Sequence, residues 1–222
     1  QSLRDAGLSR AKLAAARDEF AHAILVAPQS ASAQVIHALG GSLPNVRLVF
    51  VPDQVKPVTA ALLAAIMTVE QCQDTPLVLV PSNIVARDLE ALIDTALKMV
   101  QLLPRTDQAI TLSRLLRGTT AVPEGDMLLQ INGRNEATGL QCGRVLPGKS
   151  DLVDVEALLE MKCLAKGLGL FAISASLLLK TANSHFPNAV DACRFALQAA
   201  PSNGQAARRL GDFLKLSTSV PL

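Results

Sequence analysis

The sequence predicts an α/β protein with a mixed, mainly parallel sheet, and two patterns carry this prediction. In the first half of the chain, three short apolar runs rich in β-branched residues alternate with helical patterns, which is typical of βαβ units on a parallel sheet. In the second half, several strand-like runs follow one another without a long helix between them. We therefore expect mixed or antiparallel strands to be added to the sheet there.

Length and composition fit one folded domain. Half of the 222 residues are hydrophobic and 18% are charged, which excludes a disordered chain. A chain of this size buries most of its apolar surface in one core. We expect a single domain over residues 1–222, with residues 186–222 forming closing helices.

Turn residues and apolar periodicity set the expected boundaries. Pro28 and Pro52 end the first two strands, and Gly40-Gly41 ends a helix as a C-cap turn. The expected strands span residues 22–27, 46–51, 76–80, 108–113, 126–131, 140–146 and 167–174. The expected helices span residues 2–18, 30–39, 58–72, 86–103, 151–163, 175–186, 188–200 and 203–216. The helix over 58–72 is apolar nearly all round, so we expect it to be buried.

Composition also restricts partners and compartment. The formal charge is only +2 and the chain has neither Trp nor Tyr, which argues against a nucleic-acid groove. The longest uncharged apolar stretches fall short of the roughly 20 residues that a membrane span needs. The four cysteines lie far apart without a C-x-x-C pair, which signals neither a zinc site nor a disulfide framework. We expect a cytoplasmic protein with no metal site of this kind.

The segment Pro81-Ser82-Asn83 is the first candidate site, because it follows a buried strand. In open α/β sheets, ligands bind in the crevice outside the carboxyl ends of the strands. Asn83 also suits an N-cap of the helix that we expect to start near Ala86, and Asn is among the preferred capping residues. A Mg²⁺-assisted nucleotide reaction would use a carboxylate rather than an amide at this place, which favours the cap.

Two glycines give a second candidate. Gly167 and Gly169 flank Leu168 at the expected start of a strand, where they indicate either a close backbone approach to a ligand or a bulge or turn. No G-x-G-x-x-G, Walker A or G-x-S-x-G pattern occurs in the sequence. Redox, P-loop and hydrolase functions therefore lose their usual sequence support.

Six stretches of the chain carry a resemblance to one known family. They are SLRDAGLSR, ILVAPQSASAQV, LVFVPDQVKPVTAALLAAI, LVLVPSNIVARD, AITLSRL and GLGLFAISASLLL. In order and spacing they resemble the mannose-1-phosphate guanylyltransferases, the sugar-1-phosphate nucleotidyltransferases that make GDP-mannose. The resemblance runs from about Ser2 to Ala199 and lies in apolar spacing more than in polar residues. It implies a Rossmann-like three-layer αβα nucleotide-diphospho-sugar transferase fold.

Charged motif residues of the resembled family are replaced in this chain. The Glu and Arg of one family motif fall on Val51 and Val55, and its metal-binding Asp falls on Asn83. Further motif residues fall on Lys56, Pro57, Ile84, residues 145–147 and residues 167–169. The sequence begins after the place of the family's Gly-rich phosphate loop, so we expect a domain truncated at its N-terminus. Phosphoryl transfer needs metal ions and fixed charges, whereas the fold needs only apolar spacing.

We therefore expect a degenerate nucleotidyltransferase-like protein, catalytically weak or inactive, that binds or scaffolds in a nucleotide-sugar pathway. The alternative is an active mannose-1-phosphate guanylyltransferase that converts GTP and mannose 1-phosphate to GDP-mannose and pyrophosphate. Its catalytic loop would lie in a missing N-terminal segment, and Lys56, Asn83 and Asp88 would have altered roles. A more distant alternative is an unrelated module that shares only the fold.

These hypotheses name the same candidate residues. The nucleotide or sugar site is expected at Lys56, Pro81, Ser82, Asn83, Asp88, Gly167 and Gly169. The sequence assigns no catalytic residue and no metal ligand, and Mg²⁺ is expected only if the protein is active. The expected partners are a nucleotide or nucleotide-sugar, and a protein partner or a second copy of the chain.

Overall fold

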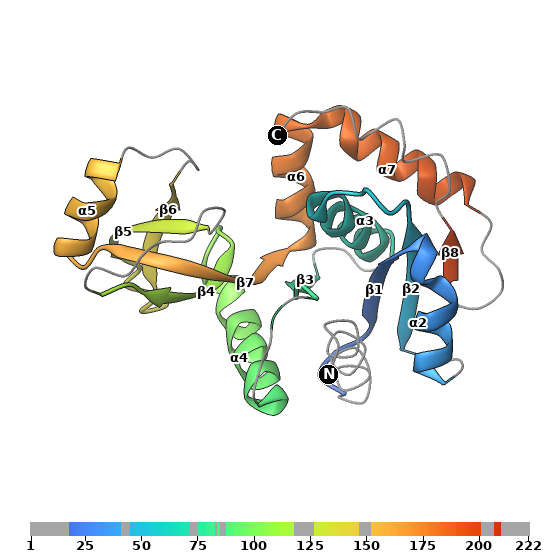
Figure 1. Ribbon diagram of the computed structural model, residues 1–222, viewed down its shortest axis with the longest axis horizontal. Coiled ribbons are helices and arrows are strands. Elements are labelled where there is room, and N and C mark those ends of the chain that lie inside the picture. Colours follow the sequence, from blue (N-terminus) through green and yellow to red (C-terminus); the bar gives the residue numbers. More distant parts are fainter. Residues whose placement is uncertain are drawn as a thin grey trace.

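The computed structural model describes residues 18–40, 45–71, 75–82, 84, 88–117, 127–146, 152–200 and 207–209 (Figure 1). Its strands are β1 Ala23–Pro28, β2 Val46–Val51, β3 Pro76–Leu79, β4 Ile110–Leu115, β5 Leu128–Arg134, β6 Gln141–Val145, β7 Leu164–Ser174 and β8 Ala207–Arg209. Its α-helices are α2 Ser32–Leu39, α3 Pro57–Val69, α4 Leu89–Leu102, α5 Leu152–Glu160, α6 Ala175–His185 and α7 Pro187–Ala199. Short 3-10 turns, η1 Gln29–Ala31 and η2 Leu103–Arg105, precede α2 and follow α4. The helix expected over residues 2–18 lies, apart from Asp18, outside the described residues.

A parallel sheet of β1, β2 and β8 confirms the first βαβ unit. β1 pairs with β2 in parallel from Ala23 opposite Val46 to Pro28 opposite Val51, with α2 as the connection. On the other edge of β2, Leu48 to Phe50 pair with Ala207 to Arg209. The helix expected over residues 203–216 is therefore wrong at β8. An unpaired edge of β2 would leave backbone N–H and C=O groups without partners, and β8 supplies them.

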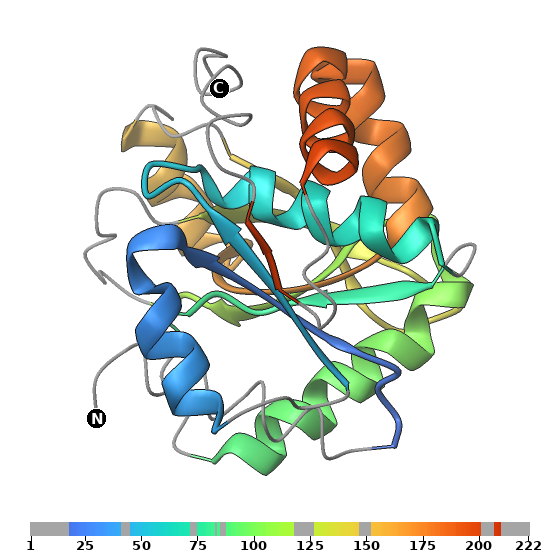
Figure 2. The same cartoon turned by 90° about the vertical axis from the view of Figure 1, so that its right-hand side faces the viewer.

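The two faces of β2 pack against different helices. Val49 and Val51 face α3, α6 and α7, whereas Leu48 and Phe50 face α2. Figure 2 shows α3 and α7 on one side of β1 and β2 and α2 on the other. This alternation follows from the two-residue period of a strand that is buried on both faces.

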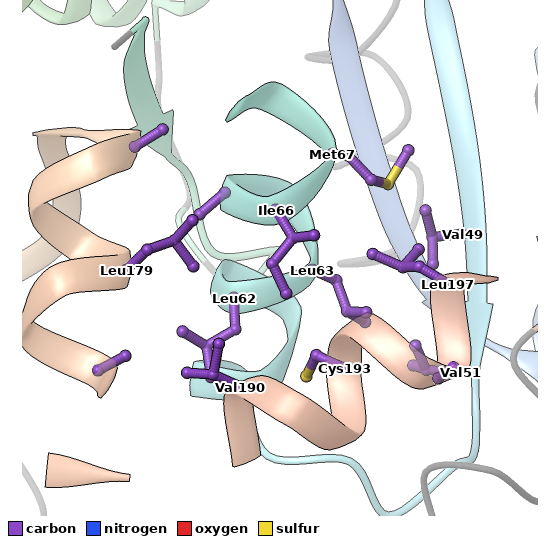
Figure 3. Close-up of a cluster of buried hydrophobic side chains, with 14 of the residues drawn as sticks. Val49, Val51, Leu62, Leu63, Ile66, Met67, Leu179, Val190, Cys193 and Leu197 are labelled. Atoms are coloured by element: carbon purple, nitrogen blue, oxygen red, sulfur yellow. The ribbon is translucent and has the colours of Figure 1, made fainter. Parts of the chain in front are cut away.

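Helix α3 occupies the centre of the larger core, as its uniform apolarity predicts. Leu62 to Met67 are all buried, and Leu63 and Ala65 are fully enclosed. Side chains of α3 meet Val190, Cys193 and Leu197 of α7 and the β2 valines (Figure 3). No helix within the described ranges is long and apolar enough to cross a membrane.

The second sheet has five strands and is antiparallel in all its pairings. β3 and β5 pair with one edge of β7, β4 pairs with the other edge, and β6 pairs with β5. β3, which was expected to continue the parallel sheet, instead runs antiparallel to β7, with Pro76 opposite Ser174. β7 also starts at Leu164, earlier than the expected Gly167. The mixed α/β class is confirmed, but the described strands form two sheets and not the one sheet expected.

Candidate functional site

A cavity of about 420 Å³ lies between β4 and the β5–β6 hairpin. Four parts of the chain line it: the segment before β4, residues 110–113 of β4, the β5–β6 hairpin with its loop, and Ala165 of β7. The floor includes Ile110, Leu129 and Ala165, which are buried. Its volume falls in the range of small-molecule sites, which run from about 300 to 1,000 Å³.

The hairpin loop over residues 135–140 is held by a set of local hydrogen bonds. The Asn135 side-chain oxygen accepts from the Thr138 backbone N–H, three residues on, at 2.9 Å, as a capping residue does. The Gly139 N–H donates to the Asn135 carbonyl at 2.8 Å, and the Asn135 N–H donates to the Leu140 carbonyl at 2.8 Å. Thr138 Oγ1 accepts from the Leu140 N–H at 3.3 Å. These bonds place Asn135, Thr138 and Gly139 along the cavity wall.

The cavity lining is polar but carries no charge among the described residues. Hydroxyl and amide side chains supply the polar atoms: Thr106, Gln108, Thr111, Ser113, Asn135, Thr138 and Gln141. Thr111 is held in place because its hydroxyl donates to the Leu170 carbonyl at 3.1 Å. Gln108, Ser113 and Gln141 are exposed. Neutral donors and acceptors around an apolar floor suit a ligand group with several hydroxyls and one less polar face.

The structure brings two of the sequence-predicted residues, Pro81 and Gly169, into contact. Gly169 has φ +84°, and a Cβ built on it would lie 3.1 Å from Cγ of Pro81. The register between β4 and β7 shifts between Thr111 and Ser113, opposite this part of β7. Of the two interpretations of the glycines, the register shift supports the bulge.

Gly167 meets protein atoms and not open space. Its N–H donates to the Met127 carbonyl at 2.8 Å, and a Cβ on Gly167 would collide with the Met127 side chain. The glycine therefore permits the close approach of Met127, the residue before β5. This leaves no described space beside Gly167 for a ligand.

Asp88, and not Asn83, is the N-cap of α4. The Asp88 carboxylate accepts from the Ala91 N–H at 3.0 Å, and the helix begins at Leu89. The expected helix start near Ala86, with Asn83 as its cap, is wrong, because the helix begins at Leu89 and the Asp88 carboxylate supplies the capping acceptor. Asn83 itself lies outside the described residues, and Ser82 is exposed beside it.

Lys56 is the N-cap residue of α3, directly before Pro57 at the first helical position. The Lys56 side chain makes no cap hydrogen bond. A nearby residue that sequence reasoning missed is Asp53, whose carboxylate accepts from the Ser30 N–H at 3.2 Å. This bond joins the loops that follow β1 and β2 at the carboxyl edge of the parallel sheet, where Asp53 remains exposed.

Three positions at which the resembled family has charged or metal-site residues are apolar and packed. Val51 is 5% exposed within the core formed with α3 and α7, and Val55 packs against the same core. Ile84 packs with Leu170 and Met99 in a separate cluster under α4. Among the described residues, no three His, Cys, Asp or Glu side chains are grouped to hold a metal ion.

The hairpin cavity was not among the sequence-predicted sites. The sequence signal that could have indicated it is the run from Asn135 to Gly139, because Asn and Gly are both typical turn residues. The convergence of this turn with Thr111 and Ser113 depends on β7, which separates β4 from β5 in the sheet. A sequence pattern does not contain that order.

Comparisons with known proteins find structural neighbours but no family. The chain matches no protein-family model and no curated protein. The crystal structure of mannose-6-phosphate isomerase from Helicobacter pylori superposes with a TM-score of 0.73 at 15% identity, over 97% of this chain and 79% of that chain. The crystal structure of mannose-1-phosphate geranyltransferase from Thermus thermophilus superposes with a TM-score of 0.64 at 16% identity, over 94% of this chain and 63% of that chain.

The chain thus has a fold that occurs in proteins named as sugar-phosphate enzymes. It spans less than two thirds of the second of these proteins. At such low identity the likeness concerns the fold alone, and function has to be argued from the site.

Proposed function

We propose that the chain is a nucleotidyltransferase-like binding module with weak or absent catalysis, and that its hairpin cavity holds the sugar part of a sugar phosphate or nucleotide-sugar. The observation that carries the loss of catalysis is the burial of Val51 in the core, with Val55 packed against it. In the resembled family these positions carry the Glu and Arg of one motif.

Burial makes this replacement difficult to compensate. A side chain that is 5% exposed and surrounded by valine, leucine and isoleucine has no water and no partner for a charge. Transfer of a phosphoryl group relies on fixed charges and metal ions near the reacting oxygens. In this chain the two positions carry valines that belong to the core or pack against it. This supports a protein that keeps the fold and lacks the charges needed for catalysis.

The cavity supports the binding part of the proposal. Its lining offers hydroxyl and amide groups without a charged side chain, so it suits the uncharged ring of a sugar better than a phosphate. A phosphate or nucleotide attached to that ring would extend toward solvent beside Gln108 and Gln141, which line the cavity and are exposed. The shared fold with proteins named as mannose-phosphate enzymes agrees with this class of ligand.

The experiment is a calorimetric titration of the purified chain with GDP-mannose, mannose 1-phosphate and GTP, each with and without Mg²⁺. Turnover assays for GDP-mannose formation and for mannose 6-phosphate isomerisation run in parallel. We expect binding of at least one of the two mannose ligands and no turnover in either assay. GDP-mannose formation at about 1 s⁻¹ or faster, the range of ordinary enzymes, would establish the active guanylyltransferase, and isomerisation at such a rate would point to the other activity; either overturns the proposal.

A matched pair of variants locates the site. Thr106→Val removes a hydroxyl from the cavity lining while it keeps the shape of the side chain. Thr95→Val makes the same change on the exposed surface of α4, where the hydroxyl donates to the Ala91 carbonyl. Thr106→Val should weaken binding about 3- to 10-fold, since one hydrogen bond contributes about 0.5–1.5 kcal/mol. Thr95→Val should leave the affinity unchanged, and equal effects of the two variants would place the ligand elsewhere.

A further inference from the structure

Arg134, the last residue of β5, holds the cavity loop from outside. Its Nε–H donates to the Gly139 carbonyl at 2.8 Å. Gly139 has φ +70°, and a Cβ on it would lie 3.3 Å from Nη2 of Arg134, so the guanidinium lies against the glycine backbone. Gly139 lines the cavity, whereas Arg134 is not among the lining residues and is exposed.

The Leu140 N–H of the same peptide unit donates to Thr138 Oγ1 at 3.3 Å, so Thr138 holds this unit from inside the loop, whereas the shorter Arg134 bond at 2.8 Å holds its carbonyl oxygen. Asn135 and Thr138 bond to backbone groups inside the loop, so they fix its internal shape. The Arg134 side chain instead ties the Gly139 carbonyl back to the end of β5. A carbonyl at a left-handed residue can rotate with its peptide plane, and a hydrogen bond to the carbonyl oxygen resists that rotation.

We propose that Arg134 is a positioning residue: through the Gly139 carbonyl it sets the orientation of the cavity wall, and so the ligand affinity and the accessibility of the cavity. The effect on affinity rests on the proposed function. The effect on accessibility does not, because it concerns the loop alone. Cys142, a partly buried free thiol in the cavity lining, reports that accessibility.

Side-chain chemistry offers variants that separate the hydrogen bond from the charge. The side-chain nitrogen of glutamine is as many bonds from Cα as Nε of arginine, so Arg134→Gln keeps a donor and removes the charge. Arg134→Met keeps a similar length and removes both. Arg144, on the paired strand β6, donates its Nε–H at 2.8 Å to the Gln130 side chain on β5 and not to the loop carbonyl of Gly139. Arg144→Met is therefore the matched control.

The experiment measures two quantities on the full chain and on each variant. The first is the rate at which iodoacetamide, a neutral reagent, alkylates Cys142, relative to Cys163 in the same molecule, by peptide mass spectrometry. The second is the affinity for mannose 1-phosphate by calorimetry. Arg134→Met should raise the relative rate at Cys142 and weaken binding about 3- to 10-fold, the range of one hydrogen bond. Arg134→Gln and Arg144→Met should stay near the native values.

The outcomes separate this proposal from the proposed function. If the native chain binds no mannose ligand, the proposed function fails, and the Cys142 rates alone decide the role of Arg134. Equal changes in Arg134→Gln and Arg134→Met would assign the effect to charge and overturn the proposal, as would native behaviour of Arg134→Met. If Arg134→Met does not fold, Arg134→Ala and Arg134→Gln give the same comparison, and equal Cys142 rates in those two variants overturn the proposal.

Discussion

A Cβ atom on Gly169 would lie 3.1 Å from Cγ of Pro81, so β7 and the residues after β3 meet where only a glycine fits. This contact joins the end of β3 to the irregular part of β7. Both residues were predicted to belong to a ligand site, and a packing contact between protein atoms accounts for their proximity.

Gly169→Ala should destabilise the fold. The backbone at φ +84° is strained for any L side chain, and the new methyl group would press on Pro81. We expect a loss of about 1–3 kcal/mol in the free energy of unfolding, measured by denaturant titration. Gly133→Ala is the control, because its Cβ would meet nothing within 4 Å and its φ is not positive. A native-like Gly169→Ala would show that β7 shifts easily at this place.

Val51→Glu should not restore chemistry. It places a carboxylate in a core position that is 5% exposed, and we expect a loss of about 3 kcal/mol or more in the free energy of unfolding. Val58→Glu is the control: Val58 is 36% exposed in the first turn of α3, where a negative charge suits the helix dipole. Its effect should stay within about 0.5 kcal/mol. A stable Val51→Glu variant that forms GDP-mannose would contradict our assignment of this position to the core.

Asp88 is a capping residue, and two variants separate that role from ligand binding. Asp88→Ala removes the acceptor for the Ala91 N–H and should cost about 1 kcal/mol of stability. Asp88→Asn keeps an acceptor oxygen and should cost much less. Unfolding and ligand titration are measured on both variants. If Asp88→Asn is stable but loses affinity for mannose 1-phosphate, Asp88 contacts the ligand as well.

Cys193 should make stability depend on alkaline pH. Burial raises the pKa of the Cys193 thiol from 9.0 to about 11, because the thiolate would have no water in the core. The folded chain then keeps a proton that the unfolded chain releases above pH 9.0. This contribution to stability is complete below pH 9.0 and is lost as pH rises toward 11, with a slope of at most about 1.4 kcal/mol per pH unit.

The measurement for Cys193 is the difference in unfolding free energy between the native chain and Cys193→Ala across this pH range. The native chain should lose more stability than the variant as pH rises, even if the variant starts lower because of the missing sulfur. Parallel curves for the native chain and Cys193→Ala would show that the thiolate is tolerated in the core.

Apolar periodicity alone determined most elements and the burial of α3. The strand β2 and the helices α6 and α7 lie close to their expected boundaries, because a two- or near-four-residue apolar period reflects which face meets the core. The βαβ unit of β1, α2 and β2 was also predictable, since local connection and handedness leave few alternatives.

Long-range pairing decided the rest. Residues around Ala207 read as helix, yet the open edge of β2 makes them a strand. β3 pairs with β7, which lies far along the chain, and the same strand brings Thr111 and the Asn135 loop to one cavity. Apolar spacing specifies which side of an element is buried, but it does not specify which edge finds which partner. The candidate site depends on that second choice, so the tertiary structure, and not the sequence pattern, decided where it lies.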